Sequence, residues 1–459
     1  MSDAWSMAEG VRSGALTSAE LVEAALATIE TRDAEVNAFT VVLAEHAREL
    51  AQDIDRDGHD GPLAGVPVSV KDHIWLAGVP ATNGSKALAD HVPDQDAACV
   101  ARLRAAGAVV VGKTNNPEFC YRGYTDNHVF GLTRNPWDLS RTPGGSSGGA
   151  GASVAYGATP IGLGTDGGGS IRIPSAFCGV VGHKPTFGLV PKMPGFRGWP
   201  TLSVDGPLTR TVRDAALALS VLAGPAPDDD LSFPYDTRGL LDAVSAPVDW
   251  SGLRVAVSED LGWAAVDRSV RAAFRAAVDV LADAGARVVD AAPDAPYPTE
   301  LWNDVALPEG FASEGPLLER WGSVMSAGTR EIVEAGRGAS AADYLDARER
   351  VRDYTRRWTR FYDGYDVLLT PSMPLAAFGT DVQGPATIDG VPVDPFFDDW
   401  CALALPANLT GTPATAVPTG LDPDGLPVGM QIMGPRGADA RTLAVAAAYE
   451  RLVRFPSGR

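Results

Sequence analysis

The chain has 459 residues, of which 45% are hydrophobic and 21% charged, so it can bury the core of a large globular protein. Its formal net charge of -20 opposes binding to nucleic acid or to an anionic membrane, because basic patches supply the affinity for both. We therefore expect a small-molecule ligand, and neither a nucleic-acid nor a membrane partner.

The four cysteines and six histidines form no familiar framework. No CxxC or HExxH spacing occurs, so we expect neither a disulfide scaffold nor a metal, and no other cofactor. The first residues lack the basic and apolar regions of a signal peptide, and no apolar run reaches the length of a membrane span. Free thiols without a signal peptide predict a cytoplasmic protein.

The first predicted elements are two helices and a strand. Thr17 and Glu20 have the spacing of a capping box and predict a helix over residues 17–31. A second helix is predicted over 40–55. Residues 66–71 form a short β-branched run, which predicts a buried strand whose last residue is a lysine.

One pattern occurs twice further along the chain. Residues 103–111 and 281–289 each read as a helix end, a glycine and then a strand. The second copy follows another predicted strand at 253–257, which makes a βαβ unit and implies a parallel pair. A further buried strand is predicted at 366–371 and a closing helix at 441–454.

No stretch has the length or low complexity of a domain linker, including the Pro/Asp-rich loops at 225–234 and 292–298. The alternation of helices and strands therefore predicts a single α/β domain over residues 1–459. Its part from about 295 to 400 is predicted to be less regular.

Three short motifs match known patterns but fail in context. Residues 107–114 satisfy the Walker A spacing, but their valine run predicts a strand rather than a phosphate-binding loop. Residues 162–167 satisfy a dinucleotide fingerprint, but the third glycine opens further glycines rather than a helix. Residues 144–148 satisfy a nucleophile elbow, but only His183 follows Ser146, too early in the chain for a triad histidine.

All five lysines lie between Lys71 and Lys192, whereas every other basic position holds arginine. Arginine keeps its proton in proteins, but a buried lysine can lose it and act as a base. Lys71 ends an apolar strand and is the candidate for this role, which Asp72 would oppose if it turned the same way. The other four are assigned no chemistry, the first and last of them being expected at the surface: Lys86, Lys113, Lys184 and Lys192.

Lys71, Ser146 and Ser170 together suggest a hydrolase that needs no histidine. A serine hydroxyl is a weak nucleophile unless a base takes its proton, and a neutral lysine can do so. Consecutive glycines at 167–169 let several backbone N–H groups converge on one point, which is how an oxyanion hole is built.

The chain resembles the amidase signature family over nearly its whole length. The matching stretches, of which the glycine- and serine-rich block is highly specific, are Val68–Asp72, Gly112–Asn115, Gly144–Gly149, Gly164–Pro174, Gly182–Thr186 and Gly425–Gln431. The resemblance implies an α/β/α sandwich around a large mixed, twisted β-sheet. It places a signature core at about 60–215 and a divergent substrate-pocket segment at about 295–400.

The same resemblance implies the roles of the site residues. Ser170 is expected to be the acyl-enzyme nucleophile, Ser146 the bridging serine after a cis Gly145–Ser146 peptide bond, and Lys71 the base. The backbone N–H groups expected to bind the oxyanion are those of Gly167, Gly168, Gly169 and Ser170. Three further residues are expected to brace this loop, namely Ser147, Asp166 and Arg172.

The substrate is less sharply indicated. Residues 115–130 resemble stand-alone bacterial amidases more than the amidotransferase version. The candidate substrate-binding residues are Cys120, Tyr121, Gly123 and Gly145. An apolar pocket is expected if several of the following aromatic side chains face the site: Trp302, Phe311, Trp321, Phe396, Phe397 and Trp400.

Three functional hypotheses remain at this point. The leading one is an amidohydrolase for small hydrophobic amides, including anilides and aryl carbamates, working as a monomer or homodimer through a Ser-Ser-Lys relay. The second is the glutaminase subunit of a tRNA-dependent amidotransferase, which works only with its partner subunits. The third is a non-catalytic protein that binds amides on the same fold, which the intact set of two serines and a lysine opposes.

Overall fold

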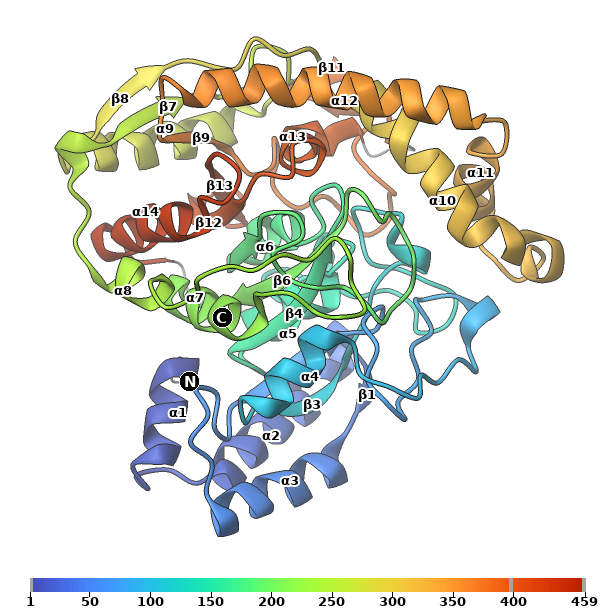
Figure 1. Ribbon diagram of the computed structural model, residues 1–459, viewed down its shortest axis with the longest axis vertical. Coiled ribbons are helices and arrows are strands. Elements are labelled where there is room, and N and C mark those ends of the chain that lie inside the picture. Colours follow the sequence, from blue (N-terminus) through green and yellow to red (C-terminus); the bar gives the residue numbers. More distant parts are fainter. Residues whose placement is uncertain (1–2, 396–398, 456–459) are drawn as a thin grey trace.

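The computed structural model describes residues 3–395 and 399–455. Its centre is a mixed sheet of eleven strands in the order β1-β3-β2-β4-β6-β5-β12-β13-β9-β7-β8, which runs from the N-terminal helices at one end of the molecule to β7 and β8 at the other (Figure 1). The strands are β1 (Phe39–Val42), β2 (Pro67–Lys71), β3 (Val109–Thr114), β4 (Ile161–Asp166), β5 (Val181–Lys184), β6 (Val204–Thr209), β7 (Arg254–Val257), β8 (Arg287–Asp290), β9 (Val367–Pro371), β12 (Ala414–Leu421) and β13 (Pro427–Met433), with β10 (Thr387–Ile388) and β11 (Val391–Pro392) pairing separately.

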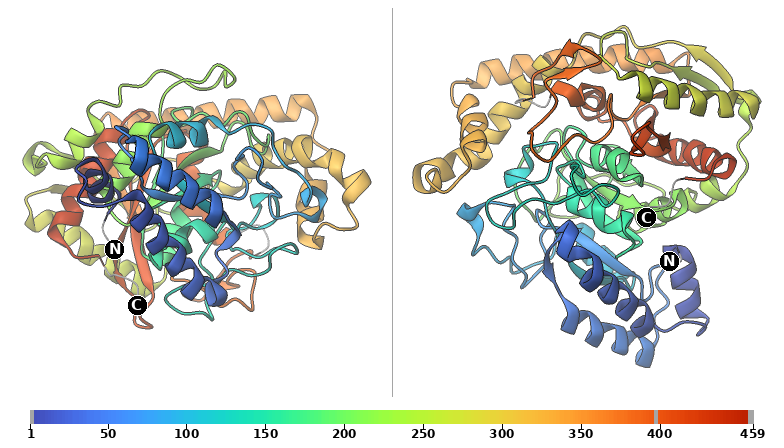
Figure 2. Two further views of the ribbon diagram at one scale, coloured as in Figure 1. Left: turned by 90° about the horizontal axis from the view of Figure 1, so that it is seen from below. Right: turned by 180° about the vertical axis from the view of Figure 1, so that it is seen from behind.

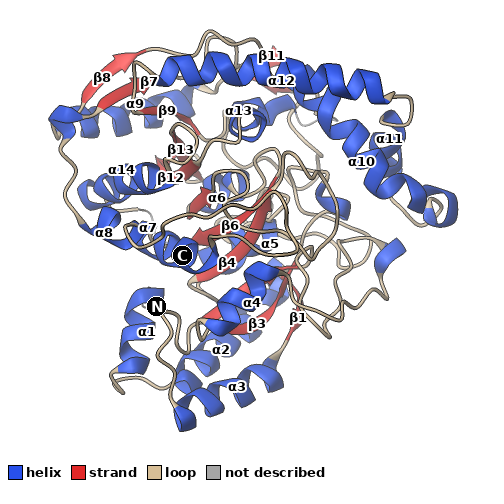
Figure 3. Ribbon diagram, in the orientation of Figure 1, coloured by secondary structure: helices blue, strands red, loops and turns tan. Residues whose placement is uncertain are grey.

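Helices cover both faces of this sheet, as Figure 3 shows in blue and red. They are α1 (Ala4–Arg12), α2 (Ser18–Val36), α3 (Ala44–Asp57), α4 (Ala98–Ala105), α5 (Gly148–Ala155), α6 (Arg172–Cys178), α7 (Val212–Leu222), α8 (Leu240–Ser245), α9 (Arg268–Asp283), α10 (Thr299–Trp321), α11 (Ala327–Ala335), α12 (Ala341–Tyr362), α13 (Leu405–Leu409) and α14 (Asp439–Leu452). Four short 3-10 helices are η1 (Lys86–Leu88), η2 (Glu118–Cys120), η3 (Trp250–Gly252) and η4 (Asp399–Ala404).

Alternation along the strands divides the core into two layers. In β7, Val255 and Val257 join the cluster that contains residues of α4, α7, α9 and α14, whereas Ala256 joins the cluster beneath α10 and α12. Successive strand side chains point to opposite faces, so an apolar run buried on both sides requires helices on both sides. The predicted α/β/α sandwich around a mixed sheet is confirmed.

Of the two helices predicted near the start of the chain, the first is confirmed and the second begins later than predicted. Thr17 caps α2 with both bonds of the predicted capping box. The predicted helix over 40–55 was wrong in its first residues, because Phe39–Val42 forms β1, which pairs antiparallel with β3, and α3 begins only at Ala44. A run of phenylalanine, threonine and two valines fits a strand better than a helix.

The repeated helix-glycine-strand pattern is confirmed at both places. Gly107 and Gly285 adopt φ of +89° and +100° after α4 and α9, a left-handed conformation that glycine accepts without strain. The strands β7 and β8 pair in parallel across α9, as the predicted βαβ unit requires. The predicted strand at 366–371 and the closing helix at 441–454 correspond to β9 and α14.

The part from 295 to 400 corrects the expectation of irregular structure. Most of residues 299–362 lie in α10, α11 and α12. In Figure 1, α12 runs along the top of the molecule and α10 and α11 lie at its right, and Figure 2 shows them from behind. Pro308 and Pro316 lie inside α10 and lower its intrinsic helix propensity. Packing of the buried Leu301 and Val305 onto the core outweighs that propensity.

The sheet topology brings two segments to one edge. Strands β2 and β4 are adjacent and parallel, with Val70 opposite Leu163, so their carboxyl ends lie side by side. Lys71 ends β2, and the residues after Asp166 continue from β4 as a loop. Ligands of such sheets bind at the carboxyl ends of the strands.

In the described part of the chain, none of the helices combines the length and apolarity needed to cross a membrane.

Candidate active site

The side chain of Lys71 is fully buried and surrounded by hydroxyl groups. Its Nζ donates hydrogen bonds to Ser146 Oγ at 2.7 Å, Ser147 Oγ at 3.1 Å and Thr165 Oγ1 at 2.7 Å. Among the described residues, no carboxylate oxygen lies within 4.0 Å of Lys71 Nζ, which is the limit for an ion pair. A lysine placed among neutral acceptors is free to lose its proton, whereas one paired with a carboxylate is not.

Burial lowers the pKa of Lys71, and the neighbouring Cys120 thiol and the more distant charges of Asp205 and Asp166 only partly oppose this. Asp72 does not join them as an ion-pair partner, because its Oδ2 accepts hydrogen bonds from Thr82 and from the Gly84 amide. The condition set by the sequence for a neutral Lys71, that Asp72 turn away, is therefore met.

The loop before α5 places the two serines against Lys71. Gly145 has no room for a side chain, because a Cβ there would lie 2.6 Å from the Tyr124 carbonyl oxygen. The Gly145–Ser146 peptide bond is cis, as predicted. Ser147 Oγ also donates to the Thr165 carbonyl and accepts from the Thr165 amide, which ties this loop to β4.

A buried ion pair shapes the loop that follows β4. Arg172 donates to both oxygens of Asp166 at 3.0 and 2.9 Å, and its remaining N–H groups bond to Ala404, Asn408 and Gln431. Although burial alone would raise the pKa of Asp166, the Arg172 guanidinium holds it well below its usual range. Both side chains are completely buried and bonded, which fits the predicted bracing role.

The Asp166 carboxylate engages the backbone amide of Gly169, one of the four expected in the oxyanion hole. Gly169 adopts φ of +125°, and its amide donates to Asp166 Oδ1 at 2.8 Å. That N–H is therefore not available to a substrate. The amides of Gly167, Gly168 and Ser170 make no hydrogen bond within residues 3–395 and 399–455, and so these three remain as candidate donors.

Trp302 holds the same loop from outside. Its indole Nε1–H donates to the Gly167 carbonyl oxygen at 3.0 Å, and its ring meets Trp199 edge-on at 5.1 Å between centroids. The carbonyl of Gly167 is thus directed toward Trp302. A fixed peptide orientation is what preorganised amide donors require.

Ser170 lies where two cavities meet. It lines both of them, as do Cys120, Tyr121 and Trp199. The Ser170 hydroxyl makes no hydrogen bond to any described residue. Ser146, in contrast to Ser170, lines only the smaller of the two cavities. Catalytic hydrogen bonds are often completed only when substrate binds, so the shared cavity is the informative observation.

The larger space, here called the apolar cavity, spans about 670 Å³, which includes its opening to solvent. Its walls come from the loop around Cys120, from α6 and from α10 and α11. Apart from Arg122, Asn303 and Thr299 they are mainly apolar or aromatic, including Ile173, Trp199, Trp302, Ala306, Leu307, Ile332 and Leu405. Such walls suit an alkyl or aryl group.

The smaller space, here called the polar cavity, spans about 380 Å³, which includes its opening to solvent. Besides the shared residues it is lined by Phe119, two glycines and six residues with polar side chains, which are His73, Ser146, Thr165, Lys192, Ser203 and Glu314. Burial lowers the pKa of His73 to about 3, so its ring is neutral at ordinary pH. Burial raises the pKa of Glu314 to about 7, where Tyr121 Oη and Ser313 Oγ donate to its oxygens.

The predicted pocket residues divide in the structure. Cys120, Tyr121 and Gly123 line the apolar cavity, whereas Gly145 lines neither cavity. Phe119 and Cys120 have positive φ of 50° and 63°, an uncommon conformation for residues other than glycine, at the point where the chain borders the site.

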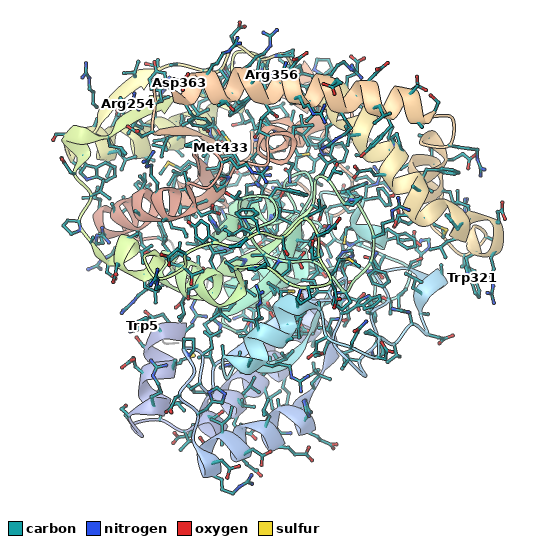
Figure 4. The ribbon with its side chains drawn as sticks, viewed as in Figure 1. Trp5, Arg254, Trp321, Arg356, Asp363 and Met433 are labelled. Carbon is teal, nitrogen blue, oxygen red and sulfur yellow. The ribbon has the colours of Figure 1, made fainter. Side chains whose placement is uncertain are left out.

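Of the predicted aromatic residues that the structure describes, only one lines either of these cavities. Trp302 does so, but Trp400 packs in the core between Phe177 and Phe378. Phe311 and Trp321 lie on α10 outside both cavities, Trp321 at the outer edge of the molecule (Figure 4). Phe396 and Phe397 lie outside the described residues.

The remaining lysines include one correction. Lys86 is exposed, as expected, but Lys192 is partly buried and lines the polar cavity rather than the surface. The reason is that the irregular chain between β5 and β6 folds over the site, which no periodicity indicated. Lys113 and Lys184 are buried and donate to backbone carbonyls, Lys113 to those of Asp72 and Ile74 in the turn after β2.

The three rejected motifs behave as their context predicted. Residues 107–114 contain the buried strand β3. Residues 162–166 lie within β4, and no helix opens at Gly167, the third glycine of the fingerprint. His183 lies away from both cavities, where its ring bonds to Thr415 and Asp439. A nucleophile-elbow triad, which needs a histidine later in the chain than Ser146, is therefore not present in the described part of the chain.

Comparison with known proteins supplies three findings. The family model described as Amidase matches residues 20–443. The chain is 38% identical to an acylamidase of Rhodococcus erythropolis, over 97% of this chain and 94% of that protein. It is also 38% identical to the A-type subunit of the glutamyl-tRNA(Gln) amidotransferase of a Roseiflexus species, over 97% of this chain and 95% of that one.

A solved structure resembles the whole chain. The crystal structure of a bacterial aryl acylamidase of the amidase signature family matches with a TM-score of 0.92 and 32% identity, covering 100% of this chain and 99% of that one. Sequence identity does not separate the acylamidase from the amidotransferase relative, so the expectation drawn from residues 115–130 needs support from the site itself.

Proposed function

The chain belongs to the amidase signature family and is an amide-hydrolysing enzyme, and we propose that it cleaves small hydrophobic amides, including anilides and aryl carbamates. The observation that carries the proposal is the apolar cavity at Ser170, with Trp199, Trp302, Ile173 and Leu405 in its walls. Burial of an alkyl or aryl substituent there supplies binding free energy in proportion to its area.

The proposed reaction begins with attack of Ser170 Oγ on the amide carbonyl carbon. Ser146 takes the proton of that hydroxyl and passes its own to Lys71, whose Nζ lies 2.7 Å from Ser146 Oγ. The oxyanion that forms is bound by the amides of Gly167, Gly168 and Ser170. A neutral lysine is the necessary base, and burial favours its neutral form.

The tetrahedral intermediate then releases the amine. Lys71 returns its proton to Ser146, and the Ser146 hydroxyl protonates the leaving nitrogen as the C–N bond breaks. The acyl group remains on Ser170 as an ester. Water, deprotonated through the same relay, attacks that ester, and the carboxylic acid leaves as Ser170 recovers its proton. An aryl carbamate would lose carbon dioxide after the corresponding step.

The test is release of 4-nitroaniline from 4-nitroacetanilide by the purified protein. Wild type should release it, and Ser170→Ala should not. Ser175→Ala is the matched control, because Ser175 is a buried serine of α6 that bonds to the Ile171 carbonyl and lines neither cavity. Release by Ser170→Ala at the wild-type rate would remove Ser170 from the proposal.

The glutaminase role in an amidotransferase is retained as a second candidate, because the amidotransferase relative is as similar as the acylamidase. It predicts ammonia release from glutamine and no release of 4-nitroaniline. The mainly apolar walls of the larger cavity favour the first candidate, since a glutamine side chain would need polar partners there.

A further inference from the structure

The two cavities that meet at Ser170 differ in which relay residue they contain. Ser146 lines the polar cavity but not the apolar one, whereas Ile173, Leu307 and Leu405 line the apolar cavity alone. A scissile amide at Ser170 therefore has its two halves in chemically different surroundings. The position of Ser146 decides which half lies in which cavity.

The leaving nitrogen must receive a proton from Ser146 if the proposed relay operates. Proton transfer requires hydrogen-bond reach, so the nitrogen and its substituent lie on the Ser146 side, in the polar cavity. The acyl half then lies in the apolar cavity, against Trp302 and Leu405. This assignment rests on the proposed function and goes beyond it, because it gives each half of the substrate a site.

The polar cavity contains a lysine whose side chain has no hydrogen-bond or ion-pair partner among the described residues. Lys192 lines it, yet its Nζ makes no hydrogen bond to any described residue and has no described carboxylate within 4.0 Å. Only the backbone amide of Lys192 is bonded, to Asp229 Oδ2 at 2.7 Å. The charges of Asp205, Glu309 and Asp229 act on this ammonium from beyond ion-pair distance, and burial lowers its pKa.

Two other titratable groups of the polar cavity, Glu314 and His73, are already engaged in hydrogen bonds. Glu314 accepts hydrogen bonds at both oxygens, from Tyr121 and Ser313. His73 Nδ1 bonds to Asn83 Oδ1 at 3.0 Å, which makes that nitrogen the donor. Because Glu314 titrates near neutrality, it opposes a second negative charge in the cavity less than an ordinary glutamate would.

We propose that Lys192 binds a carboxylate carried by the amine half of the substrate, so that the preferred substrates are N-acylated amino acids and aminobenzoates. An apolar acyl group would fill the larger cavity, and the carboxylate would complete the coordination of the lysine ammonium. A charge-assisted hydrogen bond in a partly buried site is stronger than one between neutral groups. Glutamine hydrolysis would not use this contact, because its leaving group is ammonia.

A structural role for Lys192 makes a different prediction. If the ammonium only offsets the buried charges of Asp205, Asp229 and Glu309, its removal should impair all substrates alike. A substrate-binding lysine should instead affect one substrate class, and mainly through KM. The experiment therefore compares two amides that differ only in the charge of the amine half.

The substrates are 4-(butanoylamino)benzoate and butanoyl-4-methylanilide, with the same acyl chain and ring. Wild type should show kcat/KM about 10-fold higher for the benzoate, mostly through a lower KM. Lys192→Met should bring the ratio of the two kcat/KM values close to one, and Lys192→Arg should restore part of it. Lys86→Met, an exposed lysine, should keep the wild-type ratio.

Binding of the amine product supplies a second readout. By calorimetry, 4-aminobenzoate should bind Ser170→Ala more tightly than 4-methylaniline does, and the additional substitution Lys192→Met should abolish the difference. An equal loss on both amides, or an unchanged ratio in Lys192→Met, would overturn the inference while leaving the proposed function intact. Failure of wild type to cleave either amide or 4-nitroacetanilide would instead overturn the proposed function.

Discussion

Lys71 Nζ lies 2.7 Å from Ser146 Oγ at the carboxyl end of β2, inside the protein and without a carboxylate at ion-pair distance among the described residues. This arrangement meets the two requirements of a lysine base, which are a hydrogen-bond distance to the serine hydroxyl and surroundings that favour the neutral amine. Both follow from sequence features, an apolar strand that ends on lysine and a glycine-rich loop that can approach it.

Replacement of Lys71 by methionine should abolish most amide hydrolysis while the protein stays folded. Methionine has a similar length and no proton to exchange, so kcat should fall by about 10²- to 10⁴-fold, the usual contribution of a general base. Turnover of 4-nitroacetanilide measures the effect, and circular dichroism checks the fold. Lys86→Met is the control, and near-normal turnover by Lys71→Met would exclude the relay.

The pH profile should show the titration of Lys71. Only its neutral form accepts a proton, so kcat/KM should rise with pH through the pKa of Lys71 and then level off. Because burial lowers that pKa, the rise should be complete below the pH at which an ordinary lysine titrates, near 10.5. A profile that falls toward alkaline pH would contradict a neutral lysine.

Thr165→Val should displace this rise to lower pH. The Thr165 hydroxyl accepts a hydrogen bond from Lys71, which favours the charged form, so its loss should lower the pKa of Lys71 further. Thr114→Val is the matched control. Thr114 lies opposite Lys71 in the register of β2 and β3, and its hydroxyl has no partner among the described residues. The control profile should coincide with that of wild type.

Trp302→Phe should lower kcat more than it raises KM. The substitution keeps an aromatic wall in the apolar cavity but removes the hydrogen bond that orients the Gly167 carbonyl. Loss of one such positioning bond should cost about 1 kcal/mol, roughly fivefold in kcat. Trp321→Phe, on the same helix but outside both cavities, should have wild-type kinetics. A pure KM effect in Trp302→Phe would mean that the bond does not support catalysis.

Asp166→Asn should destabilise the fold as well as the site. It leaves the buried guanidinium of Arg172 without a counter-ion, a change that typically costs about 3–5 kcal/mol. Asp236→Asn is the control, since Asp236 and Arg238 form a similar two-bond pair on the surface. Denaturation midpoints should differ clearly between wild type and Asp166→Asn, and not between wild type and the control.

Asp166 also makes the stability of the folded protein depend on pH in the acid range. The pKa of Asp166 is lowered in the folded protein, so the unfolded chain binds a proton more readily than the native one. Asp166 therefore contributes its stabilisation above the unfolded pKa and loses it as the pH falls through the folded one. Wild type should lose stability on acidification, and Asp166→Asn should lack this part of the loss. Equal acid dependence in both proteins would contradict a charged Asp166.

Much of this site could be predicted from local features. The strand that ends on Lys71 is a β-branched run, and the parallel neighbour β4 leads directly into the loop of Ser170. Thr165 was missed although it lies one residue before the braced Asp166. Its contact with Lys71 depends on which face of β4 it occupies beside β2, and a strand buried on both faces carries no polar alternation to reveal that.

The walls of the cavities were predicted less well. Trp199 and Lys192 reach the site from the irregular chain between β5 and β6, where no periodicity indicates direction. Trp302 reaches it from α10, whose prolines disfavour a helix in the sequence. Trp400 is aromatic and close in sequence to the cavity residue Cys401, yet it packs into the core. Composition alone could not separate a wall residue from a core residue.

The proposed reactive groups and part of the substrate wall come from separate stretches of this chain. Lys71, Ser146 and Ser170 lie between residues 71 and 170, whereas α10 and α11, between residues 299 and 335, supply much of the apolar wall. Mutations in those helices can therefore change which amide is accepted without passing through an inactive intermediate. That separation makes the two helices the natural target for directed evolution. It also allows enzymes with the same reactive groups to differ in substrate specificity.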